Sequence, residues 1–513
     1  MPTIFRPGGP QRYAHQVAGL RKLIETRGTA ALLFDPGLGK TATTLDYASI
    51  LALKSPSRHV RVLVTCPLAA VDTWVAQAET FVSPDVDFTA RALGGSIIQR
   101  GATLAALNGH PEGKMGPLII ERERISDPGK PHLTIAVINL DTFGQRRQIT
   151  PSMTTADYMV EAVARFAPDL LIVDESHRIK SASSNTSRLM ARVAASAPRR
   201  VILTGTVMPH SPLDVYGQWR FLDPYAFGST TAAGERRQAT LGSFRSRFAI
   251  MGGYLGREIK GFRNLDDMHR IMAERAIVAR KEDALDLPPT MNAVVPVELS
   301  AAERRAYEEM KHDLAVRFAD ADATVPNRLA QLMRLRQITS GHLPDDAGNI
   351  REIGDSKART ISSIVHDNLA GERRIVVFSQ FTHEINQLRT VLARPGTDVQ
   401  AITGATSAAD RLAIRRRFGS DDPARIVLIA QVRTMSLAVN ELVTASHAVY
   451  GSLSQLRDDY VQSRDRLNRI GQTKPVTYWL ALAPNTVDEV ILRAHEQRED
   501  LEASMLRHIQ DVR

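Results

Sequence analysis

The sequence lacks several features that would place it in a well-known class of protein. Cys66 is the only cysteine among 513 residues, which excludes an internal disulfide framework and a cysteine-ligated zinc site. A reducing, cytoplasmic compartment is therefore expected. No apolar run approaches the ~18 residues of a membrane span, and residues 1–6 lack the apolar core of a signal peptide. These absences argue against secreted and membrane proteins.

Acidic residues are fewer than basic ones. The chain has 56 Asp and Glu against 65 Lys and Arg, so its formal net charge is +9 at pH 7. A basic excess favours an anionic partner such as nucleic acid. Hydrophobic residues make up 43% and charged residues 24%, the balance of an ordinary globular chain, which excludes a wholly disordered one. The length corresponds to about three compact units.

Short apolar runs rich in β-branched residues occur in two zones of the chain. Such runs are typical of strands buried on both faces of a parallel sheet, and the helical stretches between them indicate right-handed crossovers. The sequence therefore predicts an α/β fold with two parallel-sheet units. The runs are residues 61–65, 134–138, 170–173 and 200–203 in the first zone and 374–379, 425–430 and 448–450 in the second.

Between these zones, residues 211–354 are rich in Leu, Arg, Glu and Ala and poor in buried-strand runs. Ser300 and Glu303 have the spacing of a capping box, which predicts the start of a helix. We predict a mostly helical insert and linker over 211–354, between a first unit, 1–210, and a second, 355–490. Apolar residues at helical spacing predict a C-terminal helix over 491–513.

A phosphate-binding loop is predicted between an apolar run, residues 31–34, and a helical stretch. Residues 35–41 read Asp-Pro-Gly-Leu-Gly-Lys-Thr. Glycines allow backbone N–H groups to surround phosphate oxygens, and the N-terminus of the next helix adds partial positive charge. Lys40 is expected to bind the outer phosphates of ATP, and Thr41 to ligate Mg²⁺. Further contacts to the nucleotide are expected from Gly37, Leu38 and Gly39.

A pair of carboxylates follows a buried strand. Asp174 and Glu175 come directly after residues 170–173, and ligands of open α/β sheets bind at the carboxyl ends of strands. Two adjacent carboxylates repel each other unless a cation or hydrogen bonds offset the repulsion. A solvated Asp-Glu turn is the alternative, but downstream of a phosphate loop we favour a catalytic pair. Asp174 would then hold Mg²⁺, and Glu175 would polarise the attacking water.

Together with further segments, these motifs resemble those of superfamily 2 helicases, and among them the Swi/Snf-type ATP-dependent DNA translocases. The resemblance spans nearly the whole chain, and the order of the motifs is more specific than any one of them. Residues 278–289 and 332–338 also resemble the Swi/Snf insert more than simpler helicases. The matching motifs are residues 15–16, 64–74 (motif Ia), 174–177 (the acidic box, Asp-Glu-Ser-His), 203–206 (motif III), 377–381 (motif IV) and 462–472 (motif VI).

The resemblance implies two RecA-like lobes that hold Mg-ATP between them, and it assigns roles to single residues. Gln16 would contact the adenine base. Thr204 and Thr206 of motif III, together with Gln462 of motif VI, would couple hydrolysis to the grip on nucleic acid.

The same resemblance assigns arginine fingers to Arg466 and Arg469. A guanidinium group can spread its charge over the transferring γ-phosphoryl group, and loss of such a finger costs ~10³-fold or more in rate. The two residues are three apart, so a helix would project both side chains to one face. A basic, solvated helix face is the alternative, and it would be preferred in a chain without a phosphate loop.

Two departures from the family pattern concern glycine. The stretch at the place of motif V, residues 431–442, contains no glycine, although the family has glycines there. Glycine permits positive φ and close backbone approach, so its absence bears on the coupling between ATP and DNA and not on ATP binding. Phe34 stands where the usual first glycine of the phosphate loop would be, and Asp35 and Pro36 are smaller departures.

Nucleic-acid contacts are predicted in a basic segment and in motif IV. Residues 235–263 contain seven basic and two acidic side chains, with four aromatic residues interleaved. Basic groups can contact phosphates and aromatic rings can stack on bases, but a basic surface over core aromatics is an equal alternative. No helix-turn-helix or zinc-finger pattern predicts sequence-specific recognition. The candidates are Arg245, Arg247, Ser379 and Gln380.

These observations predict an ATP-dependent helicase or translocase that uses Mg-ATP to move along single- or double-stranded DNA without sequence preference. A protein partner is left open. The alternatives are an RNA helicase, a motor subunit of a nuclease or restriction complex, and an ATP-switched DNA clamp without motor activity. Compact motors of this kind resemble those of bacteria and their phages. A bacterial or phage-infected cytoplasm, and a part in DNA repair, replication or recombination, are therefore expected.

Overall fold

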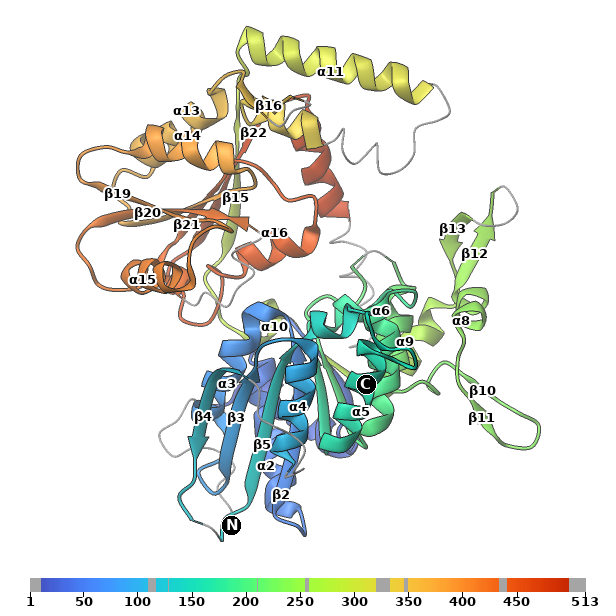
Figure 1. The fold of residues 1–513 in the computed structure, drawn as a ribbon. Coiled ribbons are helices and arrows are strands. Elements are labelled where there is room, and N and C mark those ends of the chain that lie inside the picture. Colours follow the sequence, from blue (N-terminus) through green and yellow to red (C-terminus); the bar gives the residue numbers. More distant parts are fainter. Residues whose placement is uncertain are drawn as a thin grey trace. The chain divides into compact units, whose positions relative to one another are not determined.

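The computed structural model describes residues 11–108, 117–127, 129–209, 211–253, 258–319, 333–345, 349–432 and 441–497. These residues form two compact units, unit 1 (residues 11–284) and unit 2 (residues 285–497), each built around its own sheet (Figure 1). The predicted α/β class with two parallel-sheet units is confirmed. In the described part of the chain, no helix is both long and apolar enough to cross a membrane.

Unit 1 contains a sheet of eight strands in the order β14-β1-β9-β8-β2-β5-β3-β4. Neighbouring strands run parallel except β3 and β4, which run antiparallel. The central strands are buried on both faces, as their continuous apolar runs predict. The strands are β1 (Thr29–Phe34), β2 (His59–Cys66), β3 (Asp87–Leu93), β4 (Leu118–Arg124), β5 (His132–Asn139), β8 (Leu170–Asp174), β9 (Arg200–Leu203) and β14 (Ala276–Ala279).

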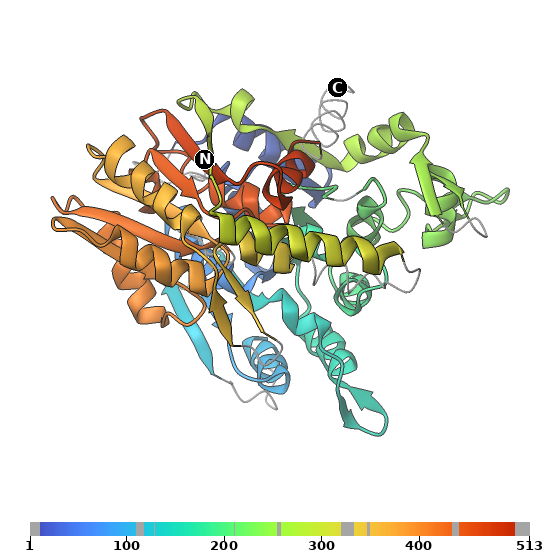
Figure 2. The ribbon, with the colours of Figure 1, turned by 90° about the horizontal axis from the view of Figure 1, so that it is seen from above.

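Helices connect these strands and enclose their core. The segment that carries the hairpins β10–β11 and β12–β13 extends from the body of unit 1 in both views (Figures 1 and 2). The helices are α1 (Ala14–Glu25), α2 (Lys40–Lys54), α3 (Val71–Phe81), α4 (Ile97–Leu107), α5 (Thr155–Phe166), α6 (Asn185–Val193), α7 (Asp214–Leu222), α8 (Leu241–Phe248), α9 (Leu265–Arg275) and α10 (Lys281–Ala284). The short hairpins are β6 (Gln148–Thr150) with β7 (Met153–Thr154), β10 (Ser229–Thr230) with β11 (Arg236–Arg237), and β12 (Ala249–Gly252) with β13 (Glu258–Phe262).

Unit 2 contains a fully parallel sheet of six strands in the order β15-β22-β21-β18-β20-β19. Two apolar clusters cover its two faces. The strands are β15 (Thr290–Pro296), β18 (Arg374–Ser379), β19 (Thr397–Ile402), β20 (Arg425–Gln431), β21 (His447–Tyr450) and β22 (Val476–Leu482), and β16 (His342–Pro344) pairs with β17 (Ile350–Glu352). Its helices include α11 (Ala301–Ala319), α13 (Ser356–Ser363), α14 (Thr382–Leu392), α15 (Ala408–Phe418) and α16 (Arg457–Arg464), and residues 333–339 and 487–497 are also helical.

The segment 211–354 contributes to both units. Its helices α7 to α10 lie in unit 1 and α11 in unit 2, and it supplies one strand to each sheet, β14 and β15. Sequence analysis missed these strands because β14 has only four residues directly after a helix, and β15 is a partly exposed edge strand. The predicted capping box is present: Ser300 N donates to Glu303 Oε2 (2.7 Å), and Glu303 N donates to Ser300 Oγ (3.3 Å).

Only the start of the predicted C-terminal helix can be compared with the structure. Residues 487–497 are helical, so this helix begins four residues before the predicted start at 491. The remaining predicted positions, 498–513, lie outside the described residues.

Candidate functional site

The predicted phosphate loop connects the carboxyl end of β1 to the start of α2. Gly37 and Gly39 have φ values of 88° and 80°, a conformation that L residues with side chains rarely adopt. Lys40 begins α2, and its Nζ donates hydrogen bonds to the carbonyl oxygens of Phe34 (2.8 Å) and Asp35 (3.4 Å). These bonds hold the ammonium group against the loop, where it adds to the positive potential of the helix N-terminus.

Gln16 of α1 reaches the phosphate loop. Its buried side chain donates from Nε2 to Leu38 O (3.2 Å) and accepts at Oε1 from Tyr13 N (3.2 Å). His15 Nε2 lies 2.9 Å from the same Leu38 oxygen. A side chain at Gly39 would displace the Gln16 amide from the loop, in addition to the strain of the positive φ. The structure brings Gln16 to the loop, and its contact with an adenine base stays a prediction.

Asp174 ends β8, and two donors orient its carboxylate. Oδ2 accepts from Trp74 Nε1 of α3 (2.8 Å), and Oδ1 accepts from Glu175 N (3.0 Å). Burial and the neighbouring Glu175 carboxylate raise the pKa of Asp174 to about 6, and the positive charge of Lys40 opposes this rise. A bound cation would relieve the repulsion between the two carboxylates, so this part of the site fits Mg²⁺. The position of Trp74 in motif Ia does not by itself predict that it orients Asp174.

Glu175 connects to motif III through a chain of polar contacts. Its backbone has φ 50° and ψ 53°, a left-handed conformation that costs a non-glycine residue ~1–3 kcal/mol. Its Oε2 lies 3.4 Å from His177 Nδ1, which lies 3.2 Å from Thr204 Oγ1. The Thr204 hydroxyl donates to Thr206 O (3.1 Å), so its contact with His177 requires a proton on Nδ1. Thr204 and Thr206 are thus linked to the acidic box.

A buried polar pair that sequence analysis did not identify connects the acidic box to α7. Ser176 Oγ donates to Gln218 Oε1 (2.7 Å), and both side chains are fully buried. Gln218 Nε2 donates to Val207 O (2.7 Å), directly after motif III, and to Asp214 O (3.1 Å). The Gln218 side chain therefore bonds both to the acidic box and to the residue that follows motif III. The sequence feature that could have indicated this pair is Gln218 itself, an amide in a helix whose buried residues are otherwise mostly apolar.

Motif III also packs directly on the phosphate loop. A Cβ atom at Gly205 would lie 2.8 Å from Pro36 Cδ and 3.3 Å from Phe34 O. On the other side, Asp35 Oδ2 accepts from Lys281 N at the start of α10 (2.9 Å). The residues at which this loop departs from the family pattern are therefore held by local contacts within unit 1.

Motif IV lies at the carboxyl end of β18, where buried polar side chains bond to one another. Ser379 Oγ and Ser452 Oγ both donate to Glu384 Oε2 (2.5 and 2.6 Å), and Gln380 N donates to Ser452 Oγ (2.8 Å). Burial raises the pKa of Glu384, although Lys357 and the two serine hydroxyls oppose this. The Ser379 hydroxyl thus supports the end of β18. Contact of Ser379 and Gln380 with nucleic acid stays a prediction.

Arg466 and Arg469 lie in turns beyond α16, and the prediction of a shared helix face is wrong. The helix ends at Arg464, after which Arg466 N donates to Ser463 O (3.3 Å) and Gln472 N donates to Arg469 O (3.0 Å). The Gln472 side chain then fixes the segment by donating from Nε2 to the backbone carbonyls of residues 443 and 445 (3.1 and 2.9 Å). Backbone turns, and not helical periodicity, therefore set the directions of the two arginines.

The predicted coupling residue of motif VI, Gln462, lies on α16, which ends two residues later at an arginine that packs within unit 2. The Arg464 guanidinium lies 4.0 Å from the centroid of the Tyr478 ring. It also donates from Nη1 to Asn292 Oδ1 and to Tyr460 Oη, both at 2.8 Å. Motif VI thus contains at least one arginine that serves the packing of unit 2.

The basic segment of unit 1 directs two of its aromatic rings into the core. Phe244 and Phe248 of α8 are 1% and 0% exposed and belong to the main apolar cluster of the unit. They are therefore not available to stack on bases. Arg245 is exposed on the same helix, whereas Arg247 forms an ion pair with Asp267 (2.5 Å).

Part of two predicted features lies outside the described residues. Residues 433–440 include most of the stretch that lacks the motif V glycines, and Tyr254 and Arg257 belong to the basic segment. The effect of the missing glycines on coupling stays a prediction.

Comparison with protein families identifies two domains in order along the chain. Residues 15–342 match the SNF2-related domain, and residues 356–471 match the helicase conserved C-terminal domain. The first match contains the phosphate loop, the acidic box and motif III. The second contains motif IV and nearly all of motif VI.

Curated relatives share about a quarter of the sequence. The chain is 25% identical to Protein CHROMATIN REMODELING 4 of Arabidopsis thaliana over 96% of this chain and 21% of that protein. It is 23% identical to the DNA annealing helicase and endonuclease ZRANB3 of Bos taurus over 66% of this chain and 30% of that protein. An uncharacterised ATP-dependent helicase of Mycoplasma genitalium is 22% identical, over 74% of this chain and 35% of that protein. The chain thus spans about a fifth to a third of the length of these relatives.

Among solved structures, the Sulfolobus solfataricus SWI2/SNF2 ATPase core in complex with dsDNA aligns with a TM-score of 0.39 and 17% identity. The alignment covers 99% of this chain and 98% of that chain. The family assignment itself comes from the SNF2-related match, which covers more than half of the chain. The chain therefore belongs to the SNF2-related family of superfamily 2 helicases, which are nucleic-acid-dependent ATPases.

Proposed function

We propose that the chain is an ATP-dependent DNA translocase that uses residues of both units to hydrolyse Mg-ATP. The observation that carries the proposal is the chain of polar contacts Glu175–His177–Thr204 in unit 1. It connects a hydrolytic carboxylate beside a phosphate loop to motif III. Such a connection allows the state of the nucleotide site to be transmitted to a second loop.

The phosphate loop and the acidic box would bind different parts of Mg-ATP. Backbone N–H groups at Gly37 and Gly39 and the Lys40 ammonium group would bind the phosphates of ATP. Thr41 and Asp174 would hold Mg²⁺, whose charge, when bound, neutralises the phosphate oxygens. Within the described ranges, no three His, Cys, Asp or Glu side chains gather as a metal site. Mg²⁺ in such enzymes uses one or two protein ligands together with phosphate oxygens, so the proposed pair is sufficient.

Glu175 would orient and deprotonate the attacking water. Its left-handed backbone and the contact with His177 restrict where its carboxylate can lie. A fixed carboxylate is a better general base than a freely rotating one, because the reacting atoms must already lie within hydrogen-bonding distance.

Arg466 and Arg469 of unit 2 would complete the reaction by stabilising the charge that develops on the γ-phosphoryl group. Because these residues belong to a different compact unit from Lys40 and Glu175, hydrolysis would require the two units to close. A nucleic acid that binds both units would favour the closed state and so stimulate the ATPase.

DNA is the nucleic acid along which the chain is proposed to move. The names of two relatives refer to chromatin or DNA. The hairpin segment of unit 1 also presents exposed arginines, which suit contacts with phosphates independent of sequence. These residues are Arg236, Arg237, Arg245 and Arg263.

The first test is steady-state ATP hydrolysis without nucleic acid and with single-stranded DNA, duplex DNA or RNA, using Lys40→Ala as the blank. Strong stimulation by DNA that is absent from the blank is the expected result. Stimulation by RNA alone would favour an RNA helicase, and no stimulation would contradict the proposal. Displacement of a triplex-forming strand from duplex DNA then distinguishes movement along DNA from hydrolysis without movement.

The alternative of an ATP-switched clamp makes a different prediction for Glu175→Gln. A clamp needs nucleotide binding only, so this variant would keep DNA-dependent function. A translocase would lose movement while it still binds ATP and DNA. The motor of a nuclease complex would behave as a translocase, and DNA cleavage would appear only when the partner nuclease is added.

A further inference from the structure

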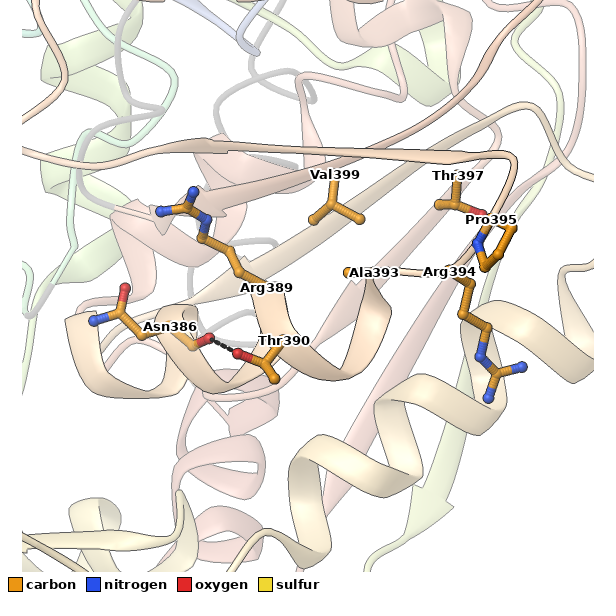
Figure 3. A pocket seen from close by; sticks show the side chains of 8 residues that line it. All are labelled: Asn386, Arg389, Thr390, Ala393, Arg394, Pro395, Thr397 and Val399. Atoms are coloured by element: carbon orange, nitrogen blue, oxygen red, sulfur yellow. Dashed lines mark hydrogen bonds between the residues drawn. The ribbon is translucent and has the colours of Figure 1, made fainter.

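A groove on the surface of unit 2 lies between helix α14 and strand β19 (Figure 3). Its volume is about 770 Å³, within the range of binding pockets in proteins. Arg389 extends from α14 toward the strand, and Val399 of the strand projects into the space between them (Figure 3). The groove thus combines an exposed strand, an apolar side chain and a cationic group.

Strand β19 is the edge strand of its sheet. In the described part of the chain it pairs with β20 along one side, with Thr397 opposite Arg425 and Ile402 opposite Ala430. Alternate residues of an edge strand direct their N–H and C=O groups away from the sheet, where an extended chain can pair with them. The six residues of β19 are long enough to accept one more strand of ordinary length.

The lining of the groove is cationic. It includes Arg389 and Arg394, both exposed, and no acidic side chain. Neither arginine has an ion-pair partner among the described residues. The acidic residue of the strand, Asp398, is already paired with Arg417 (2.5 Å) and so does not neutralise the groove.

We propose that this groove binds an extended acidic peptide segment of a partner protein, which adds to β19 as a further strand. The backbone of the segment would pair with the open edge of β19. Its carboxylates would bind Arg389 and Arg394 through charge-assisted hydrogen bonds, and an apolar side chain would pack on Val399 and Ala393. This proposal does not depend on the hydrolytic role assigned to unit 1.

A peptide fits the groove better than nucleic acid does. A nucleic-acid strand offers phosphates to the arginines but no regular row of donors and acceptors for the open backbone of β19. Two arginines among mostly uncharged lining residues also make a smaller cationic surface than non-specific DNA binding uses.

The test measures binding of a fluorescein-labelled peptide of about ten residues, with Glu and Val alternating, to the full chain by fluorescence polarisation. Arg389→Glu/Arg394→Glu is expected to weaken binding roughly 100-fold, since each charge-assisted contact contributes about tenfold. Arg351→Glu/Arg416→Glu makes the same change at exposed positions outside the groove and should leave binding unchanged. All four positions are exposed, so unchanged thermal unfolding confirms that the variants are folded.

Strand addition is tested separately from charge. Two further peptides carry N-methyl groups on odd or on even residues, which removes the N–H groups along one edge of the peptide. Only the peptide methylated on the edge that faces β19 should lose binding. Equal binding of all three peptides, or equal binding by both double variants, would overturn the proposal. So would single-stranded DNA of the same length that displaces the peptide and depends equally on Arg389 and Arg394, because the groove would then be a nucleic-acid surface.

Discussion

The carboxyl edges of the two sheets differ in how their polar groups are satisfied. In unit 1, two carboxylates, Asp174 and Glu175, lie side by side near Lys40, and the pKa of Asp174 is raised by burial and by this repulsion. In unit 2, one buried carboxylate, Glu384, receives hydrogen bonds from two serine hydroxyls at Oε2 only, its Oε1 has no hydrogen-bond partner among the described residues, and the positive charge of Lys357 opposes the rise of its pKa by burial. Parallel-sheet architecture alone therefore does not make a site. A site requires charges that the protein itself leaves unbalanced and a ligand can balance.

The largest effect is expected from the two arginines that unit 2 is proposed to contribute to the reaction. Arg466→Ala and Arg469→Ala are each expected to lower kcat by ~10³-fold, because the transferring phosphoryl group loses an arginine finger. Binding of a fluorescent ATP analogue to unit 1 should persist. Arg493→Ala, an exposed arginine of the same unit, serves as the control. Full activity of both finger variants would show that unit 1 hydrolyses ATP by itself.

Replacing a carboxylate by an amide at each sheet edge should affect the ATPase rate differently. Glu175→Gln should lower kcat by at least ~10²-fold, because the amide cannot accept a proton from the attacking water. Glu384→Gln keeps an oxygen that can accept from Ser379 or Ser452, so it should keep the ATPase rate. Steady-state hydrolysis with saturating DNA compares the two variants. Equal losses would mean that Glu384 has a role in the chemistry.

The raised pKa of Asp174, caused by burial and then by the Glu175 charge, also predicts an effect on stability. A carboxyl group whose folded pKa is raised favours the protonated form, so stability rises as pH falls through about 6 toward the unfolded value of 3.8. Asp174→Asn removes the buried charge and should raise the free energy of unfolding at pH 7 by up to ~3 kcal/mol, while Mg-dependent hydrolysis is lost. Urea unfolding without Mg²⁺ at pH 7 and pH 4.5 measures this, and the gain should shrink at the lower pH. A destabilised variant at pH 7 would contradict the assignment.

The buried pair behind the acidic box predicts a separation of stability from coupling. Gln218→Leu leaves the Ser176 hydroxyl and the Val207 carbonyl without this partner, and should cost ~1–3 kcal/mol in the free energy of unfolding. Adding Ser176→Ala removes one of the two orphaned groups and should recover part of that loss.

Coupling should not recover with stability. If the amide positions motif III, DNA stimulation of the ATPase stays low in the double variant although the protein is folded. Urea unfolding and DNA titrations of the ATPase measure the two quantities. Recovery of both together would assign Gln218 a purely structural role.

The smallest effect is expected at the basic helix of unit 1. Arg245→Ala removes one exposed cation and should reduce the slope of log affinity against log salt for duplex DNA by ~1. Arg247→Ala should change that slope less, because Asp267 already pairs with Arg247. Equal slopes in both variants and the parent would place the DNA contact elsewhere.

Much of the architecture was predictable because it depends on short-range patterns. Continuous apolar runs identified most of the central strands, although the buried strand β22 was not among them. The glycine loop before Lys40 required a strand-to-helix turn whatever the rest of the chain does. The missed strands show the limit of this approach. Strand β14 is too short to be separated from the preceding helix, and β15 lies at a sheet edge where burial places weaker demands on its residues.

Sequence motifs alone established a phosphate loop, an acidic pair and an arginine-rich motif in the order of a superfamily 2 helicase. Spacing could not determine which polar groups would meet. The fold connected Glu175 to Thr204 and Ser176 to Gln218, and it turned Arg466 and Arg469 out of a helix. It also placed Phe244 and Phe248 in the apolar core of unit 1. Local propensity fixes elements and turns, but hydrogen bonds between residues far apart in sequence arise only when the fold brings those residues together, here where strands and helices meet at the carboxyl edge of a parallel sheet.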